Sequence, residues 1–295
     1  MMSRIRFIQE IYLEEINMKK TVAVLLTVFN RKDITLKGLS TLYAAMKPVE
    51  DKYSFDVYMT NDGCTDGTPE TVKKCFPAVH VINGDGNLYW SGGMRKAWDV
   101  AAKTHDYDYY LWFNDDAVLY ENALEMMFEP FEKYGEKTIV SGAFCDDDGN
   151  ISYGGRNRNN QYVIPNGTNC SIYLMNGNLV LIPRCVYDLI GNISKDYHHS
   201  FGDWDYGIRA LRKGFHVLLT AGVVGSTNRH DSVIPAFIKG NTVKERVDKL
   251  YSPLFSVLDM WHFRMMDKGI LYSIIPFFLM HIYAICPKVY YLTHN

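Results

Sequence analysis

The sequence predicts an α/β protein built on a doubly wound sheet with right-handed crossovers. Apolar runs with β-branched residues alternate four times with helical segments up to residue 114, and the connections are short. Strands that are continuously apolar are typical of parallel sheets, because both of their faces are buried. Composition agrees, since 47% of the 295 residues are hydrophobic and 22% are charged.

The first strand is predicted from the apolar run TVAVLLTVFN at 21–30, and Asp33 is a suitable N-cap for a helix that extends to about residue 46. The same logic predicts the other elements of this half. We expect strands at 55–62, 79–83 and 107–114, a short helix ending near residue 76, and a helix over 94–103 that follows a Gly-rich loop.

The second half has a different pattern, which predicts a mixed α+β region added to the same sheet. A polar stretch rich in Gly and Asn at 146–161 indicates a hairpin or a loop. We expect a helix at 121–134, a strand at 138–144, a strand and short helix within 176–191, a loop and amphipathic helix within 201–215, and a last strand at 216–220. The predicted domains are an N-terminal extension (1–20), a main domain (21–235) and a C-terminal helical tail (236–295).

The tail contains a strongly apolar segment, 269–292, that is interrupted by Pro276 and Pro287. A membrane-spanning helix needs about 20 apolar residues, and this segment nearly qualifies. Its prolines, tyrosines and basic residues favour a broken helix that lies in a membrane interface. A helical hairpin packed on the main domain, or on a second subunit in a homodimer, is the alternative.

Charge and cysteine content narrow the function classes and the location. The net charge of −2 and the pI near 6.5 give no basic face, so nucleic acid is not expected as a partner. Six cysteines are scattered without a CxxC pair, which favours reduced thiols in a cytosolic protein. With no visible signal peptide, we expect a cytoplasmic location, at the inner face of the cell membrane if the tail binds lipid.

Polar residues follow all four predicted strands of the first half. Asn30 and Asp62 end the first two strands, Asn87 lies in the loop after the third, and Asn114, Asp115 and Asp116 end the fourth. Ligands of open α/β sheets bind beyond the carboxyl ends of the strands. The four polar ends therefore predict one binding site.

Asp115 and Asp116 pose an electrostatic problem, because two adjacent carboxylates at a strand end repel each other. The sequence WFNDDAV places no basic residue beside them. A divalent cation would compensate them, since Mg²⁺ and Mn²⁺ prefer carboxylate oxygens and keep coordination sites for substrate phosphates. Capping of the next helix is the alternative, but it explains only one of the two carboxylates.

Two glycine-containing segments suggest contacts with a nucleotide. In NDGCTDGT (61–68), the Asp62 carboxylate could accept hydrogen bonds from a base or a ribose, although an ordinary turn capped by Asp66 is an alternative. In GNLYWSGG (86–93), the backbone around Gly92 and Gly93 could approach phosphate at a helix N-terminus.

Five segments in order over residues 21–214 resemble the family-two glycosyltransferases of the GT-A fold. They are TVFNR, NDGCTDGT, GNLYWSGG, FNDDAVL and FGDWDYGIRALRKG. The chain looks most similar to the bacterial rhamnosyl- and galactofuranosyl-type transferases of surface polysaccharide synthesis. The resemblance implies a GT-A (Rossmann-like) and mostly parallel sheet with flanking helices over about 230 residues, and it leaves out the apolar C-terminal helical extension.

The resemblance also implies roles for individual residues. Asp116 matches the metal- and diphosphate-binding position of a DxD-like motif, and His230 the position of a third metal ligand, although a solvated loop histidine is an alternative. Asp203 matches the catalytic base, but Gly202 replaces the usual Glu, so Asp205 stays open as the base. The resemblance implies substrate contacts at Thr27, Phe29, Asn30, Asp62, Asn114 and Asp115. The residues themselves suggest further contacts at Asn87, Gly92 and Gly93 of the Gly-rich loop, and at Trp204, which is either stacked on a sugar or buried in the core.

The predicted function is therefore an inverting, metal-assisted glycosyltransferase that uses Mn²⁺ or Mg²⁺. It moves a sugar from a UDP- or dTDP-sugar donor to a hydroxyl of a glycan or lipid-linked acceptor. One alternative is a sugar-nucleotide nucleotidyltransferase, which would normally show a Gly-rich, basic signature after the first strand. Another is a non-catalytic subunit of a polysaccharide assembly complex.

Overall fold

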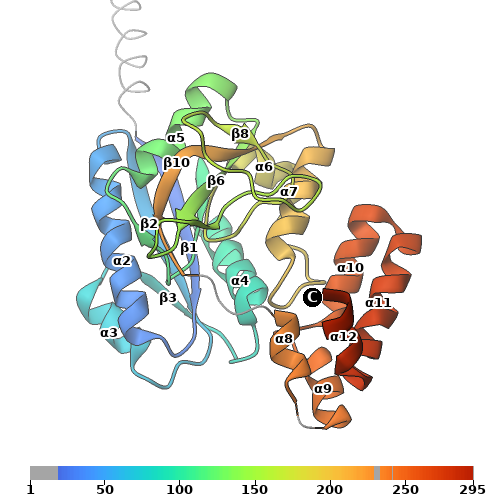
Figure 1. Cartoon of the computed structure of the whole chain (residues 1–295). Helices are drawn as coiled ribbons and strands as arrows, with labels where there is room; N and C mark the ends of the chain where they lie inside the picture. The colour runs from blue at the N-terminus through green and yellow to red at the C-terminus, as the bar shows by residue number, and fades with distance from the viewer. Residues whose placement is uncertain (1–18, 229–232, 241, 295) are drawn as a thin grey trace, which may run out of the picture.

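A ten-stranded mixed sheet with helices on its faces organises the chain in the computed structural model, which describes residues 19–228, 233–240 and 242–294. A cluster of C-terminal helices lies to one side of the sheet (Figure 1). The predicted N-terminal extension falls almost entirely outside the described residues.

The first half forms the parallel part of the sheet, as the alternating pattern predicts. Each strand lies within two residues of its predicted bounds, and the first strand pairs in parallel with the second and the fourth. The strands are β1 (Lys20–Val28), β2 (Tyr53–Asn61), β3 (His80–Asn83) and β4 (Tyr109–Phe113); the helices are α2 (Lys32–Met46), η1 (Lys47–Val49), α3 (Thr68–Cys75) and α4 (Tyr89–Thr104).

Helix α4 differs from its prediction because it begins at Tyr89, five residues before the expected start near Met94. The Asp62 carboxylate explains the early start, since it accepts hydrogen bonds from the backbone N–H groups of Leu88 and Tyr89, each at 3.0 Å. These are donors that a helix N-terminus otherwise leaves unsatisfied. Residues 89–93 of the expected phosphate-binding loop therefore lie inside a helix, and only 86–88 precede it.

The second half of the chain adds both antiparallel and parallel strand pairs to the sheet, as expected. Strand β9 (Leu179–Pro183) runs antiparallel between β4 and β6 (Thr138–Cys145), and β6 pairs in parallel with β10 (His216–Ser226). The remaining elements are β5 (Val118–Leu119), α5 (Ala123–Tyr134), β7 (Ile151–Tyr153), β8 (Cys170–Ser171), α6 (Arg184–Ile190) and α7 (Gly202–Arg212). The strand order is β3-β2-β1-β4-β9-β6-β10-β5, with β7 beside β6 and β8 beside β10.

Two apolar layers cover the faces of the sheet and fix its position between the helices. One contains Leu39 and Met127 from α2 and α5, and the other contains Trp98 from α4 and Tyr206 from α7. Trp98 and Trp112 are fully buried and contact each other edge to face, with ring centroids 5.6 Å apart. The sheet is therefore a rigid support for the loops at its carboxyl edge.

The tail folds into five helices with a small apolar cluster of its own. They are α8 (Val233–Ile238), α9 (Val243–Leu250), α10 (Val257–Lys268), α11 (Ile270–Ile285) and α12 (Pro287–His294). Helix α10 contacts α7 of the main domain, and α11 packs on α9 and α10. In the described part of the chain no single helix is long and apolar enough to cross a membrane, while α11 and α12 meet that test only as a pair bent by 120°.

Candidate active site

Two adjoining cavities open at the carboxyl edge of the sheet. The Asp203 cavity, of about 570 Å³, contains Asp203 and Asp116, and the Asp62 cavity, of about 490 Å³, contains Asp62. Arg31, Trp90 and His199 line both cavities, so the two cavities adjoin, and we refer to them together as the cleft. The three carboxylates that the sequence predicts to act together come from separate segments and reach this cleft.

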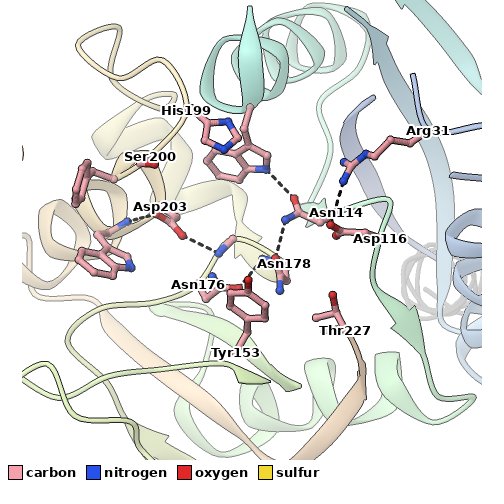
Figure 2. A pocket seen from close by; sticks show the side chains of 14 residues that line it. Arg31, Asn114, Asp116, Tyr153, Asn176, Asn178, His199, Ser200, Asp203 and Thr227 are labelled. Carbon is pink, nitrogen blue, oxygen red and sulfur yellow. Dashed lines mark hydrogen bonds and ion pairs between the residues drawn. The ribbon is translucent and has the colours of Figure 1, made fainter. Parts of the chain in front are cut away.

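Asp203 lies in the first turn of α7 and faces the larger cavity (Figure 2). Its carboxylate accepts hydrogen bonds from the backbone N–H groups of Gly177 and Trp204, both at 2.9 Å. Burial raises the pKa of Asp203 to about 6, and these hydrogen bonds oppose the increase only in part. A carboxylate with this pKa is ionised at neutral pH and still basic enough to take up a proton.

Gly177 allows the close contact between the turn before β9 and Asp203. A Cβ atom at this position would lie 2.5 Å from the Trp90 ring and 3.4 Å from Cβ of Asp203. The first distance is shorter than any van der Waals contact, so only glycine fits between the two side chains. The turn thereby fixes both Trp90 and the Asp203 carboxylate.

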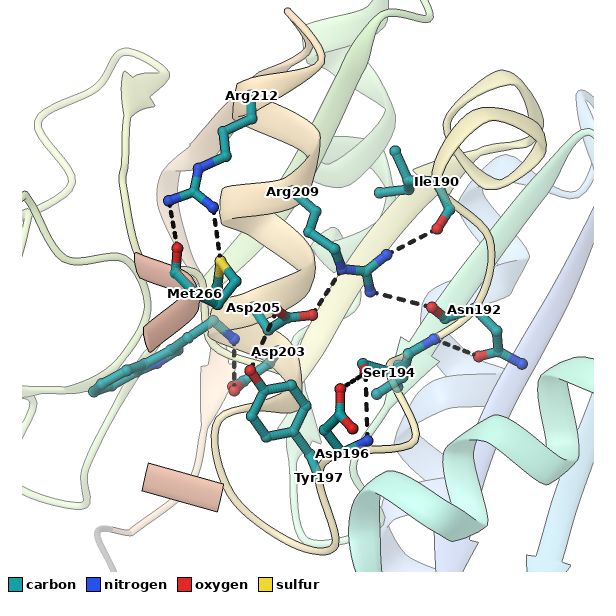
Figure 3. A network of polar contacts seen from close by, with 12 residues as sticks. Ile190, Asn192, Ser194, Asp196, Tyr197, Asp203, Asp205, Arg209, Arg212 and Met266 are labelled. Carbon is teal, nitrogen blue, oxygen red and sulfur yellow. Dashed lines mark hydrogen bonds and ion pairs between the residues drawn. The ribbon is translucent and has the colours of Figure 1, made fainter. Parts of the chain in front are cut away.

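Asp205 is two residues further along α7 and has a different environment (Figure 3). It is 3% exposed, pairs with Arg209 at 2.7 Å and accepts a hydrogen bond from the Tyr197 hydroxyl at 3.3 Å. Arg209 also donates to the backbone oxygens of Ile190 and Asn192. Asp205 is absent from the walls of the cleft, so of the two candidate bases only Asp203 is placed to contact a substrate.

Asp115 and Asp116 are compensated by Arg31, which the local sequence could not show. The Arg31 guanidinium pairs with Asp116 at 3.1 Å and also pairs with Asp115. Asp115 is completely buried and accepts a hydrogen bond from the Thr35 hydroxyl at 2.6 Å. The expectation that both carboxylates lack a basic partner is therefore wrong, because the turn after β1 brings Arg31 to them.

The two carboxylates consequently have different positions relative to the cleft. Asp116 lines the Asp203 cavity, whereas Asp115 lies beneath it, where burial raises the pKa of Asp115 to about 6 despite the nearby Arg31. Asp115 thus anchors Arg31 and α2 from below and is not placed as the direct substrate contact that the sequence suggested.

Asn114 is also held by the protein. Its Oδ1 accepts a hydrogen bond from the Trp90 indole at 2.7 Å, and its Nδ2 donates to Asn178 Oδ1 at 2.6 Å. In the view of Figure 2, Asn114 and Asn178 lie between Asp203 and Asp116. Asn114 therefore fixes the floor of the cleft, and the Trp90 indole holds its side-chain oxygen in place.

The donor set for a metal ion is small. Within the described ranges no group of three or more His, Cys, Asp or Glu side chains is arranged to hold a metal. Asp116 is the one predicted metal ligand that lines the cleft, and predicted ligand His230 lies outside the described residues. One carboxylate fits a Mg²⁺ or Mn²⁺ ion that is shared with substrate phosphates, since such ions commonly use one or two protein carboxylates.

Asp62 lines the smaller cavity but is largely occupied by backbone. Besides its two bonds at the start of α4, it accepts a hydrogen bond from Gly86 N at 2.9 Å and is 4% exposed. Gly86 of the loop after β3 lines the cleft, and so do Tyr89 and Trp90 at the start of α4. Asp62 therefore shapes the loop that forms the cavity wall, and its contact with a nucleotide base stays a prediction.

Three other residues of the segment 86–93 do not line either cavity. Asn87 is exposed and its backbone N–H donates to Asp85, while Gly92 and Gly93 are buried in α4. A Cβ on Gly93 would lie 2.0 Å from Thr27 Oγ1, so this glycine lets α4 pack closely against β1. The prediction that Gly92 and Gly93 present amides to phosphate is wrong, because those amides belong to the helix interior.

The end of β1 contributes the other wall of the Asp62 cavity. Thr27 and Phe29 line it, and Phe29 is 54% exposed. Asn30 instead holds the neighbouring turn, since its Oδ1 accepts a hydrogen bond from Thr65 N at 2.7 Å. Trp204 lines the Asp203 cavity and contacts Phe263 edge to face, and its stacking on a sugar stays a prediction.

The sequence did not single out several residues of the cleft, namely Arg31, Trp90, Tyr153, Asn176, Gly177, Asn178, His199 and Ser200. The signal for one group was present in NGN at 176–178, which precedes an apolar strand. Because β9 is antiparallel to β4, the beginning of β9 lies beside the end of β4. Only the strand order reveals that neighbourhood.

A mixed sheet whose edge holds a two-part cleft, with a basic carboxylate in one part and an acidic strand end beside it, defines a group-transfer enzyme of the GT-A type. Comparison with known families agrees. The sequence profile described as glycosyl transferase family 2 matches residues 23–187, more than half of the chain. The protein therefore belongs to glycosyltransferase family 2.

Solved structures support the fold. The mannosyltransferase PcManGT from Pyrobaculum calidifontis, in complex with GDP-Man and Mn²⁺, has a TM-score of 0.55 and 13% identity, over 89% of this chain and 74% of that one. GalNAc-T7 with UDP, GalNAc and Mn²⁺ has a TM-score of 0.53 and 12% identity, over 90% of this chain but only 55% of that one. A comparison with curated protein sequences found no match.

Proposed function

We propose that this protein is an inverting glycosyltransferase that moves a sugar from a nucleoside-diphosphate donor to an acceptor hydroxyl. One observation carries the proposal: Asp203 and Asp116 line one cavity, which joins the cavity of Asp62 through the shared residues Arg31, Trp90 and His199. Direct displacement needs a base on one side of the sugar and a site for the leaving diphosphate on the other. This cleft offers both.

Asp203 acts as the general base in this proposal. A base is most effective when its pKa is near the working pH, and burial moves the pKa of Asp203 to about 6. The two backbone N–H groups that bind its carboxylate also hold its orientation. Proton transfer from the acceptor hydroxyl to Asp203 raises the nucleophilicity of the oxygen as it attacks the anomeric carbon, and in-line attack inverts the configuration there.

Asp116 and Arg31 are proposed to receive the diphosphate. Asp116 would hold Mn²⁺ or Mg²⁺ together with the phosphate oxygens, and a bound ion would supply Lewis-acid stabilisation of the leaving group. Arg31 lies beside Asp116 and its guanidinium is suited to phosphate. Because Arg31 is paired with both carboxylates, its position is fixed before the donor arrives.

The Asp62 cavity is proposed to bind the nucleoside. Phe29 and Tyr89 line it together with Asp62, so a planar base meets aromatic side chains and a carboxylate. We favour UDP- or dTDP-sugars and a hexosyl or deoxyhexosyl donor, of the rhamnosyl or galactofuranosyl type, as the sequence resemblance implies. The product would be a surface polysaccharide of the cell envelope.

The location is proposed to be the cytoplasmic face of the cell membrane. Helix α11 contains no charged residue except a histidine, and a series of its apolar side chains is exposed. Lys268 and Lys288 flank it at either end. An apolar helix face with flanking basic residues is suited to an interface of anionic lipids.

Calorimetric titration of UDP, dTDP and GDP with and without Mn²⁺ tests the donor site, and donor turnover tests the chemistry. We expect Mn²⁺-dependent binding that Asp116→Ala abolishes, with turnover that Asp203→Asn abolishes while binding persists. A nucleotidyltransferase would instead bind a nucleoside triphosphate and a sugar phosphate. Turnover that survives both substitutions would refute the assigned chemistry, and absence of any nucleotide binding would favour a non-catalytic subunit.

A further inference from the structure

A third cavity, of about 410 Å³, lies between the main domain and the tail helices. It shares Ser200, Phe201 and Trp204 with the Asp203 cavity, so it continues the cleft on the side of the proposed base. We call it the tail cavity. A substrate whose hydroxyl reaches Asp203 would have this space available for the rest of the molecule.

The lining of the tail cavity is mainly apolar. Its hydrophobic residues come from α8 to α11 and from the turn before α10, and they include Phe237, Leu250, Phe255, Val257, Met260 and Met280. A space of this size is within the range of small-molecule sites, which are about 300–1,000 Å³. Sugars carry hydroxyl groups that such walls cannot satisfy, so the lining is suited to a hydrocarbon and not to a glycan.

The polar residues of the tail cavity provide one charge. They are Ser200, Asn160 and Arg156, and Arg156 is the charged residue among them. The Arg156 guanidinium lies 3.9 Å from the ring centroid of Tyr162, and its Nη1 donates to Asn160 O at 2.9 Å. Arg156 is therefore held at the cavity wall and could pair with an anionic group next to a hydrocarbon chain.

The same tail helices present the exposed apolar face of α11. Met280 of α11 lines the cavity, while Leu271, Ile275 and Phe278 of the same helix are 78%, 67% and 60% exposed. One helix thus has one face on the cavity and another on solvent. A hydrocarbon chain that is anchored in a bilayer would contact both the cavity and the exposed face of α11.

We propose that the tail cavity binds the hydrocarbon chain of a lipid-phosphate-linked acceptor, with Arg156 facing its phosphate and its sugar beside Asp203. This inference rests on the proposed function, because it names the acceptor of the same site. It also chooses between the two acceptor classes that the sequence left open, a free glycan and a lipid-linked one.

Binding of alkyl phosphates to the full-length protein tests the assignment without requiring turnover. Dodecyl phosphate, below its micelle concentration, is compared with butyl phosphate by calorimetry. Each buried methylene increases affinity about fourfold, so we expect dodecyl phosphate to bind at least about 100-fold more tightly. A chain brominated near its phosphate end should quench tryptophan fluorescence, and Trp204→Phe should remove most of that quenching, because Trp204 lines the tail cavity where it adjoins the Asp203 cavity.

Two substitutions probe the two ends of the ligand. Ile234→Trp fills the cavity from a half-buried position and should weaken dodecyl phosphate at least tenfold. Arg156→Gln should weaken dodecyl phosphate about tenfold and leave neutral dodecyl maltoside unchanged. Leu271→Ser, on the exposed face of α11, is the matched control and should leave the affinity for dodecyl phosphate unchanged.

The outcomes separate this inference from the proposed function. Equal affinity for the two alkyl phosphates, in a protein that binds nucleotide with Mn²⁺ and turns over donor, would overturn the cavity assignment alone. Tight dodecyl phosphate binding without nucleotide binding would support the cavity assignment and remove the proposed donor site. Sedimentation that shows Ile234→Trp dissociating a dimer would overturn the assignment, because the occupant would be a second copy of this chain.

Discussion

Two aspartates in one turn of helix α7 illustrate how surroundings decide the role of a side chain. Asp203 accepts bonds only from backbone N–H groups and lines a cavity, whereas Asp205 pairs with Arg209 and is 3% exposed. The sequence could not choose between them, because both are carboxylates in a loop-to-helix segment. In the structure the two aspartates differ in their hydrogen-bond partners and in whether they line the cavity.

We predict opposite effects for the matched pair Asp203→Asn and Asp205→Asn. Asp203→Asn should lower kcat by about 10²- to 10⁴-fold with little change in melting temperature, because it removes a general base. Asp205→Asn should destabilise the protein by about 3 kcal/mol, because it leaves Arg209 without its carboxylate. Donor turnover and thermal unfolding measure the two effects, and a reversal of the pattern would assign the base to Asp205.

The pH dependence of turnover follows from the raised pKa of Asp203. Below about pH 6 the carboxyl is protonated and cannot accept the acceptor proton. We therefore expect kcat/KM to fall tenfold per pH unit below about pH 6 and to level off above it. Stopped assays between pH 4.5 and 8 would show this limb in the wild type, and a profile that is flat across this range would contradict the assignment.

Gly177→Ala should reduce turnover without touching a group that reacts. The new methyl group would displace Trp90 or the turn that donates to Asp203, because it would lie 2.5 Å from the indole ring. We expect kcat to fall at least about tenfold and stability to fall by about 1–3 kcal/mol. Gly222→Ala is the control, since its nearest atom lies at 3.4 Å; equal effects at both sites would refute the close-contact argument.

Backbone conformation also marks the cleft at the scale of single residues. Among the described residues, the non-glycine positions with positive φ are Asn30, Tyr89, Asn160 and Phe201. Tyr89 and Phe201 line the cleft, Asn160 lines the tail cavity, and Asn30 lies between two residues of the cleft wall. Such conformations are sparsely populated and concentrate at binding sites.

At the scale of elements, the sequence predicts the parallel half of the sheet well and the site incompletely. Most of β1, all of β4 and the second half of β2 are buried, and runs of mainly apolar residues identify these strands and the short β3 within two residues. The start of α4 was missed because it depends on Asp62, a distant carboxylate that caps the helix. Local patterns contain no information about such a contact.

For the candidate site, too, the sequence predicts some residues and leaves out those that depend on distant contacts. Acidic residues at strand ends were found because the fold rule states where ligands bind, and Asp62, Asp116 and Asp203 do reach one cleft. Arg31 was missed as the partner of Asp115 and Asp116, because it lies more than 80 positions away from them in the sequence. The contributions of β9 and of the loop before α7 depend on strand order, which hydrophobic periodicity does not specify.

Helix α10 is predicted to influence turnover from outside the cleft. Asp259, 1% exposed in its first turn, accepts hydrogen bonds from His198 N at 2.7 Å, next to the cleft residue His199. Asp259→Ala should lower kcat at least about tenfold, because the loop before α7 loses its anchor and His199 of that loop lines both cavities. Ser256→Ala removes the other partner of Asp259 and should affect stability only; a loss of kcat in Ser256→Ala as large as in Asp259→Ala would contradict this assignment.

At the scale of the whole molecule, the tail helices make membrane contact testable. Leu271→Ser combined with Ile275→Ser removes two apolar side chains that are 78% and 67% exposed. We expect sedimentation with anionic vesicles to fall at least about tenfold, while turnover of a water-soluble donor stays constant. A double variant that still binds vesicles but no longer self-associates would show that α11 faces a second subunit.

Arg31, Trp90 and His199 belong to the walls of both halves of the cleft, so a movement of any of these side chains changes both halves. A nucleotide that reorients any of these side chains also reshapes the space beside Asp203. By thermodynamic linkage, whatever factor the donor adds to acceptor affinity, the acceptor adds to donor affinity. Under the proposed function, Arg31, Trp90 and His199 are therefore the side chains through which sugar loading and acceptor capture can affect each other.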